Sequence, residues 1–230
     1  MLELFIANKN YSSWSLRPWL ILRELEIPFT ERLLRFDDRG AWAELRAISP
    51  AGKVPCLRDG AQVIWESLAI AEHLAERHPA VWPADPIARS WARSASAEMH
   101  AGFPALREVC SMSCGIRVRL GARPAALVRD LERLVALWTA GMHRFGGPWL
   151  AGPAFSAVDA FFAPVAFRAR TYGLGLGRIA DAYVTHLLAR PAMQAWYAAA
   201  LAEPFRDPEH DAEVRRVGEV IADLRAPASA

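Results

Sequence analysis

Glu66 and Ser67 are neighbouring residues whose types could together hold a charged small molecule. They open the helical pattern SLAIAEHLAERH. The first backbone amides of a helix lack intrahelical partners and carry partial positive charge, so they favour an anionic group. The Ser67 hydroxyl adds a donor at this place, and the Glu66 carboxylate could hold an ammonium group. The pair would suit a ligand with an amine and a carboxylate on one carbon. Taken alone, the two residues favour the simpler interpretation that they cap the helix.

A hairpin signal lies just before this pair. Asp59-Gly60 stands between two short apolar runs, and both central positions of such a turn need positive φ. This predicts strands at about 55–58 and 62–65. Pro55 is allowed at the start of the first strand where no ladder donor is needed, and its preceding peptide bond could be cis. Val54 would then keep its backbone N–H and C=O free for whatever lies beside the loop.

The ordered combination of Pro55, the hairpin and Glu66-Ser67 resembles the glutathione-binding half of cytosolic glutathione S-transferases. The resemblance implies that Val54 pairs its backbone with the cysteinyl part of glutathione. It also implies that Glu66 and Ser67 hold the γ-glutamyl amino and carboxylate groups. Lys53 could meet the glycine carboxylate, or it could simply be solvated.

The segment Ser12–Ser15 lies where thioredoxin-like redox proteins carry Cys-x-x-Cys, so disulfide exchange at this site is excluded. A serine hydroxyl at a helix N-terminus could instead donate to a thiolate supplied by a ligand. Lowering a thiol pKa by about two units requires roughly 2.7 kcal/mol. One charge-assisted hydrogen bond together with helix-terminal amides could supply that stabilisation.

The run SSWSLR is similar to the serine motif of zeta-class transferases, the maleylacetoacetate isomerase group. The resemblance puts the thiolate-stabilising role on Ser12, with Ser13 as the alternative. Trp14 stands where that motif has cysteine, which leaves the isomerase assignment open, and Arg17 stands at the motif's arginine. Without the downstream motifs, Ser12 and Ser13 would be read as loop and cap residues only.

The order of elements predicts two domains. Residues 1–79 read as strand 2–6, a helix with Pro18 in its first turn, strand 29–36, a short helix near 42–47, the hairpin and a final helix. This is the order of a thioredoxin-like α/β domain. The proline-rich residues 80–86 form a linker. Residues 87–230 are expected to form an all-α domain with helical patterns at 87–120, 124–145, 179–188, 191–202 and 207–224. Ser156 and Asp159 form a capping box with a structural role.

The resemblance implies that the helical domain lines the pocket for an electrophile. Its candidate lining residues are Trp14, Arg17, Met99, His100, Phe103 and Arg107. His100 could polarise a substrate group, although an isolated histidine is more often only packed and hydrogen-bonded. Arg17 could meet an anionic substrate, and a structural ion pair is the plainer expectation.

The bulk composition excludes several other classes. The 27 basic and 25 acidic residues are scattered, which argues against nucleic acid binding. The N-terminal sequence lacks a secretion signal, and no apolar stretch is long enough for a bilayer, so we expect a cytoplasmic protein without membrane contact. Cys56, Cys110 and Cys114 make a poor disulfide framework or zinc site, so no metal is expected and the cysteines are read as small packed residues.

The resemblance therefore implies a homodimeric glutathione S-transferase with glutathione as its co-substrate. It would activate glutathione as a thiolate for attack on, or isomerisation of, a small electrophile. Two alternatives keep the same glutathione contacts: a glutathione-dependent peroxidase, and a non-catalytic glutathione-binding or regulatory relative. A glutaredoxin-type reductase fits poorly because Cys-x-x-Cys is missing.

Overall fold

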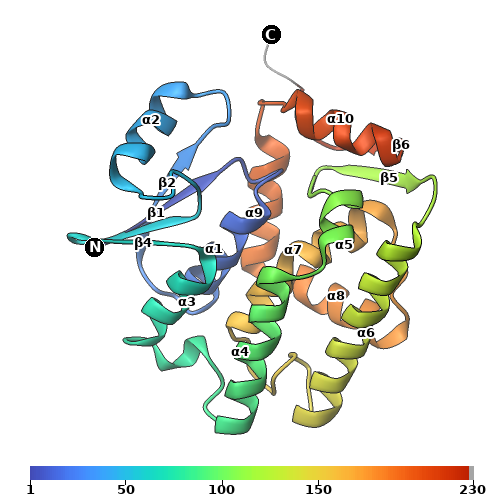
Figure 1. Ribbon diagram of the computed structural model, residues 1–230, viewed down its shortest axis with the longest axis horizontal. Coiled ribbons are helices and arrows are strands. Elements are labelled where there is room, and N and C mark those ends of the chain that lie inside the picture. Colours follow the sequence, from blue (N-terminus) through green and yellow to red (C-terminus); the bar gives the residue numbers. More distant parts are fainter. Residues whose placement is uncertain (228–230) are drawn as a thin grey trace.

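The computed structural model describes residues 1–227. The N-terminal part of the chain forms a four-stranded sheet (Figure 1). Its strands lie in the order β2-β1-β3-β4, with β1 and β2 parallel and the other pairs antiparallel. The strands are β1 (Leu2–Ala7), β2 (Phe29–Leu34), β3 (Cys56–Asp59) and β4 (Gln62–Trp65). The helices of this part are α1 (Ser13–Glu24), α2 (Arg39–Ile48) and α3 (Ser67–Ala75). The predicted thioredoxin-like architecture is confirmed.

The second part of the chain is mainly helical. A 3-10 turn, η1 (Pro79–Val81), lies in the proline-rich segment between α3 and α4. The helices that follow are α4 (Pro86–Ala101), α5 (Pro104–Val109), α6 (Ala125–Phe145), α7 (Ala157–Tyr172), α8 (Arg178–Leu188), α9 (Pro191–Ala202) and α10 (Pro208–Val217). None of the helices within residues 1–227 combines the length and the apolar character that crossing a bilayer demands.

Two stretches expected to be helical form an antiparallel ribbon instead. Strand β5 (Ile116–Leu120) pairs with β6 (Gly218–Asp223), and Figure 1 shows β5 beside α10 at the edge of the helical domain. The sequence IRVRL alternates apolar and polar residues, and its Ile116 and Val118 side chains are buried. That period of two is a strand signal, so the helical interpretation of 116–120 and of 218–224 was wrong.

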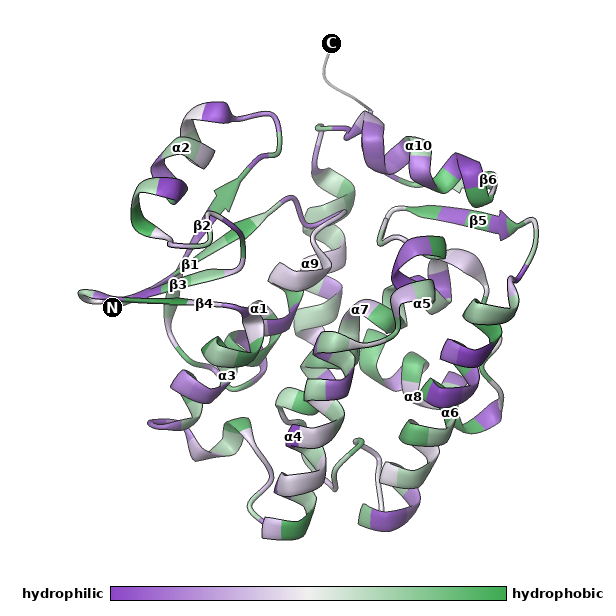
Figure 2. Ribbon diagram, in the orientation of Figure 1, coloured by the Kyte–Doolittle hydropathy of each residue, from purple (hydrophilic) through white to green (hydrophobic). Residues whose placement is uncertain are grey.

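Helix α7 is the centre of the core. Nearly all of its side chains are buried, and α1 of the first domain packs directly against it. One continuous apolar cluster reaches from Leu4 and Leu20 in the first domain to Trp138 and Trp196 in the second. In Figure 2 the outlying helix α10 is mostly hydrophilic, in contrast to the central elements. The two domains therefore share one apolar core, in which α1 of the first domain packs against α7 of the second.

The predicted capping box at the start of α7 is confirmed. The Asp159 carboxylate is fully buried and accepts hydrogen bonds from the Ser156 N–H at 3.0 Å and the Leu150 N–H at 3.1 Å. It also accepts one from the Tyr183 hydroxyl at 2.9 Å. These bonds connect the loop before α7 to α8 and thereby fix the N-terminal end of α7.

Candidate active site

The N-terminus of α1 presents a pair of linked serine hydroxyls. Ser12 precedes the helix, but its side chain caps no backbone amide and instead donates to the Ser15 Oγ at 2.7 Å. Ser15 is fully buried, and its oxygen accepts from the Ala7 N–H at 3.2 Å. A hydroxyl can both donate and accept, so Ser15 can donate to Ser12 and leave the Ser12 proton for a ligand.

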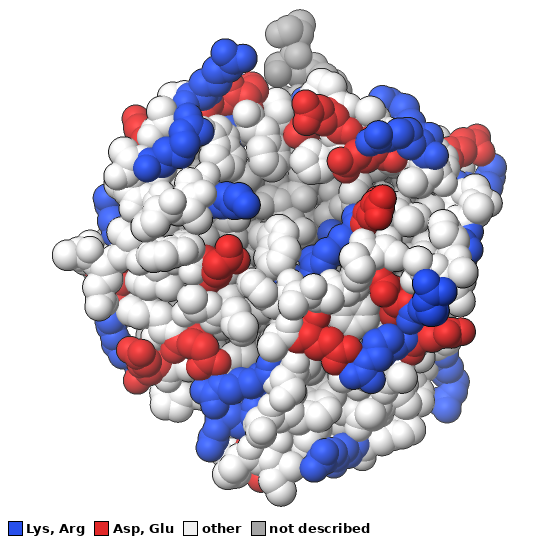
Figure 3. Space-filling model, in the orientation of Figure 1, with Lys and Arg blue, Asp and Glu red and all other residues white. Residues whose placement is uncertain are grey.

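A cavity of about 400 Å³ opens beside these serines, between the two domains. Both Ser12 and Ser13 lie in its wall. One side is aromatic: the Phe36 and Trp42 rings are stacked with centroids 6.0 Å apart, and His210 of α10 stacks on Phe36 at 5.6 Å. Figure 3 shows a depression on this face, with Lys or Arg side chains on either side of it.

A second cavity of about 350 Å³ adjoins the first. Its wall contains Lys53, Val54 and Glu66, three of the four residues that the resemblance links to parts of glutathione, together with Pro55 of the same motif. Lys53, Val54 and Trp14 line both cavities, so the loop before β3 separates them. The Val54–Pro55 peptide bond is cis. Val54 lies outside both strands, and its backbone takes part in none of the loop hydrogen bonds within residues 1–227.

Glu66 occupies the position before α3 without capping that helix. Its backbone has φ of +68°, which is uncommon for a residue with a side chain, and no helix amide donates to its carboxylate. The carboxylate is about half exposed and lies 3.8 Å from the His100 Nε2. The plain capping interpretation is therefore wrong for Glu66. Uncommon backbone conformations of residues with side chains cluster at functional sites, which keeps Glu66 a candidate.

Ser67 is placed differently from its neighbour. It is fully buried, lies in the wall of neither cavity, and its Oγ accepts from the Arg17 Nη1 at 3.3 Å. Its hydroxyl does not cap α3 either. The hydrogen bond from Arg17 to Ser67 links α1 to α3. Ser67 is also the first residue of α3, directly after Glu66.

Arg17 is buried without the ion pair that the sequence led us to expect. Within the described residues no carboxylate lies at ion-pair distance from it, and its guanidinium stacks on the rings of Trp14 at 4.1 Å and Phe161 at 5.0 Å. Arg107 stacks on Trp14 as well, at 4.8 Å. Trp14 therefore contacts two guanidinium groups, and a cation over an electron-rich ring is a favourable arrangement.

The remaining candidates divide into two groups. His100 lies in the Glu66 cavity with its ring edge against Trp14, and burial together with the nearby Arg17 charge lowers its pKa, which favours the neutral imidazole. Arg107 lies in the Ser12 cavity. Met99 and Phe103, in contrast, are buried in the core and line neither cavity.

Sequence reasoning missed several residues of this site. Ser15 supports Ser12 from behind, and Arg168 of α7 lines the Ser12 cavity. Ser15 lies inside the motif SSWSLR, so its spacing from Ser12 was an available signal. Arg168 had only one signal, a basic residue within an otherwise apolar helix, which by itself does not indicate a site.

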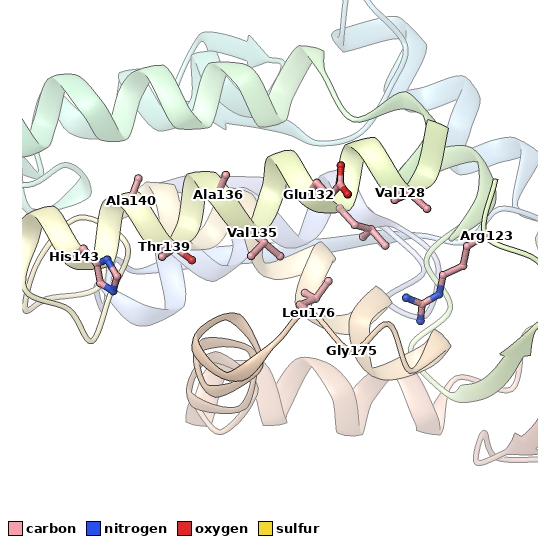
Figure 4. Close-up of a pocket in the computed structure, with 11 residues that line it drawn as sticks. Arg123, Val128, Glu132, Val135, Ala136, Thr139, Ala140, His143, Gly175 and Leu176 are labelled. Carbon is pink, nitrogen blue, oxygen red and sulfur yellow. The ribbon is translucent and has the colours of Figure 1, made fainter. Parts of the chain in front are cut away.

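A groove larger than either of these cavities lies elsewhere, along α6 and the loop before α8 (Figure 4). It measures about 690 Å³ and is lined mainly by apolar side chains such as Val128, Val135 and Leu176. Its ionisable residues, Arg123, Glu132 and His143, include no candidate nucleophile. Across residues 1–227, no three His, Cys, Asp or Glu side chains gather in a way that could hold a metal ion.

Known proteins match the chain over most of its length. Residues 11–77 match the family model of the glutathione S-transferase N-terminal domain, and residues 119–199 match that of the C-terminal domain. The chain is 30% identical over 176 residues to the Caenorhabditis elegans protein named "Probable maleylacetoacetate isomerase". The aligned region covers 75% of this chain and 81% of that protein. It is 26% identical over 182 residues to the "Glutathione S-transferase-like protein OpS6" of Beauveria bassiana, with coverages of 71% and 77%.

Solved structures agree with this fold. A glutathione transferase homologue from Burkholderia gl BGR1, solved with bound glutathione, aligns with a TM-score of 0.64 at 23% identity over 86% of this chain and 97% of that chain. Ure2p in complex with glutathione aligns with a TM-score of 0.64 at 19% identity, with coverages of 85% and 97%. With both family models matched and the fold shared, this chain belongs to the cytosolic glutathione S-transferase family.

Proposed function

We propose that the protein is a glutathione transferase that activates glutathione as a thiolate at Ser12. The observation that carries the proposal is the meeting of two cavities at the Val54 loop. One cavity is lined by Glu66, whose side chain is half exposed, and the other is lined by Ser12 and Ser13. A tripeptide held by Glu66, the Val54 backbone and Lys53 would place its sulfur toward Ser12. The bound glutathione in the Burkholderia homologue supports this choice of ligand.

The chemistry required of the site is modest. The free thiol has a pKa of about 8.5, so only a few per cent is ionised at neutral pH. Donation from the Ser12 hydroxyl, with the N-terminal amides of α1 behind it, favours the thiolate over the thiol. The thiol proton goes to solvent. The sulfur then forms a bond to the electrophilic carbon. In a substitution the leaving group departs with its electron pair; in an addition the electron pair of the double bond moves onto the acceptor, which takes a proton from solvent.

A glutathione-dependent isomerase is the second candidate. It is favoured by the name of the C. elegans relative and by the two serines that open the SSWSLR run. The tryptophan at position 14 weighs against it, since a large ring in contact with two arginines fills the position of the motif's cysteine. We therefore place transfer before isomerisation.

Conjugation of 1-chloro-2,4-dinitrobenzene tests the proposal. The wild-type protein should form the glutathionyl product at a saturable rate. Ser12→Ala should lower kcat roughly tenfold to hundredfold at neutral pH. Without the Ser12 hydroxyl the pKa of the bound thiol rises, and the fraction present as thiolate falls by up to about tenfold for each unit of that rise. Ser13→Ala is the matched control and should change the rate by less than about threefold. A wild-type rate no higher than the uncatalysed one, together with no glutathione binding in calorimetry, would overturn the proposal.

A further inference from the structure

Two arginines of the helical domain converge on the Ser12 cavity. Arg168 is 4% exposed, and it reaches the cavity wall from α7. Its Nε donates to the Cys110 carbonyl oxygen at 2.7 Å, which fixes the orientation of the planar guanidinium. Its Nη1 is buried and has no hydrogen-bond partner among the described residues. A buried donor on a charged group without a partner is costly, so its presence calls for an explanation.

Arg107 reaches the same cavity from α5. Its Nε donates to the Gly102 carbonyl oxygen at 3.0 Å and its Nη2 to the Met99 carbonyl oxygen, while the guanidinium lies on Trp14. Its position is therefore fixed by neutral partners. Within residues 1–227 neither Arg107 nor Arg168 has a carboxylate at ion-pair distance, in contrast to arginines such as Arg93 and Arg133.

The acidic residues around the pair are already used or stand apart. Asp130 accepts a hydrogen bond from the Leu106 N–H at 2.9 Å. Glu213 of α10 lies in the cavity wall, and no ion pair joins it to either arginine among the residues that the structure describes. Two fixed cations thus face a shared cavity, and within residues 1–227 neither has a carboxylate at ion-pair distance. An incoming anion would relieve their mutual repulsion and could receive bidentate hydrogen bonds from a planar guanidinium.

The geometry points to an anion subsite at Arg107 and Arg168 that selects electrophiles bearing a carboxylate. This inference rests on the proposed transferase function and names the substrate class of the same site. The subsite is separate from the glutathione contacts, because neither arginine lines the cavity that contains Glu66. The apolar body of such an electrophile would pack against the opposite aromatic wall, at Phe36 and Trp42, with its reactive carbon toward Ser12.

Binding without turnover tests the subsite directly. The probes are 3,5-dinitrobenzoate and its neutral isostere 3,5-dinitrobenzamide, which lack a leaving group, measured by calorimetry on the full-length protein. We expect the carboxylate to bind at least about tenfold more tightly than the amide, the scale of one charge-assisted hydrogen bond. Arg107→Gln and Arg168→Gln should each lower that preference several-fold. Arg144→Gln, an exposed arginine of α6 outside the cavity, is the charge-matched control and should preserve it.

Turnover gives a second readout. The electrophiles are 4-chloro-3,5-dinitrobenzoate and 4-chloro-3,5-dinitrobenzamide; in both, the glutathione sulfur displaces chloride and the thiol proton goes to solvent. The ratio of kcat/KM for carboxylate over amide should exceed about ten in the wild type and fall toward unity in Arg107→Gln. If Arg168→Gln does not fold, the ratios of the wild type and of Arg107→Gln still test whether the subsite selects the carboxylate.

The outcomes separate this inference from the function on which it rests. Equal binding of benzoate and benzamide would overturn the subsite, even in an active transferase. A clear preference for the carboxylate without conjugation of either chloro compound would preserve the subsite and overturn the transferase proposal. A preference that Arg144→Gln abolishes and Arg107→Gln retains would also contradict the subsite, because the anion would then be bound elsewhere.

Discussion

The hydroxyl oxygens of Ser12 and Ser15 lie 2.7 Å apart, and the Ser15 oxygen also accepts from the Ala7 N–H. Ser15 therefore connects the end of β1 to the residue proposed to face the glutathione sulfur. When the Ser12 hydroxyl donates its hydrogen bond to a thiolate, it no longer donates to Ser15. Ser15 is then in position to donate a hydrogen bond to the Ser12 oxygen. Such chains of hydrogen bonds strengthen one another in a buried setting.

We predict that Ser15→Ala weakens thiol activation without removing it. The pH dependence of kcat should move to higher pH, by less than in Ser12→Ala, because Ser12 loses only its supporting donor. The free energy of unfolding should also fall by about 1–3 kcal/mol, since the Ala7 amide loses its partner. Stopped-flow rates between pH 5.5 and 9 and urea denaturation measure the two effects. A pH profile identical to the wild type would restrict Ser15 to a structural role.

Glu66→Gln should weaken glutathione binding by about tenfold, because an ammonium group loses its charged acceptor while the side-chain shape is kept. Calorimetry with glutathione measures the change. Glu72→Gln is a suitable control: Glu72 lies on the neighbouring helix α3, where its carboxylate pairs with Arg93 at the surface. Equal affinities of the wild type and Glu66→Gln would remove Glu66 from the ligand site.

We predict that the buried Asp159 carboxyl group makes the free energy of unfolding depend on pH in one direction. Burial raises its pKa to about 6, outweighing the hydrogen bonds from Leu150, Ser156 and Tyr183 that lower it. The ordinary value is 3.8, so between about pH 4 and 6 the native state binds this proton more tightly than the unfolded chain. The stability that comes from this proton is therefore complete below pH 4 and is lost as the pH rises through 6.

Asp159→Asn has no proton to titrate at this position. The difference in free energy of unfolding between the wild type and Asp159→Asn should favour the wild type more at pH 4.5 than at pH 7.5. Urea denaturation of both proteins at the two pH values measures this difference. A difference that stays constant, or that grows with pH, would contradict the assigned direction.

The three cysteines should be unreactive in the folded protein. Cys56, Cys110 and Cys114 are all buried, and burial raises the pKa of Cys110 and of Cys114 to about 12. At pH 8 only about one such thiol in ten thousand is ionised. We predict negligible reaction with an aromatic disulfide reagent in buffer and three reactive thiols in guanidinium chloride. A fast-reacting thiol in the folded protein would instead indicate an accessible cysteine.

Much of the fold could be predicted because local signals were strong. The bounds of β4 follow from the Asp59-Gly60 turn, and those of α9 from its opening proline, so both were placed correctly. The ribbon of β5 and β6 could not be located in the same way, because it pairs residues that are distant in the chain. The apolar residues of 214–224 satisfy a helical spacing on their own, and only the presence of β5 makes a strand of their second half.

The candidate site likewise combines residues that a local motif predicts with residues that only the folded chain brings together. Glu66, Val54 and Pro55 stand in one local motif, so sequence alone brought them together. Arg168 joins the site only because α7 packs against α1 and because Arg168 reaches the Cys110 carbonyl at the end of α5, and both depend on the packed core. Ser67 illustrates the converse, since a motif position does not reveal whether a hydroxyl faces a cavity or a buried arginine.

The central claim is that Ser12 stabilises the thiolate of bound glutathione. An ultraviolet difference titration of the protein with glutathione, from pH 5 to 9, measures the bound thiol directly through its thiolate absorbance. The account predicts a thiolate band with a midpoint about two pH units below that of free glutathione in the wild type, shifted back toward the free value in Ser12→Ala with glutathione still bound. Bound glutathione that titrates like the free thiol in the wild type, or a midpoint unchanged in Ser12→Ala, would contradict it.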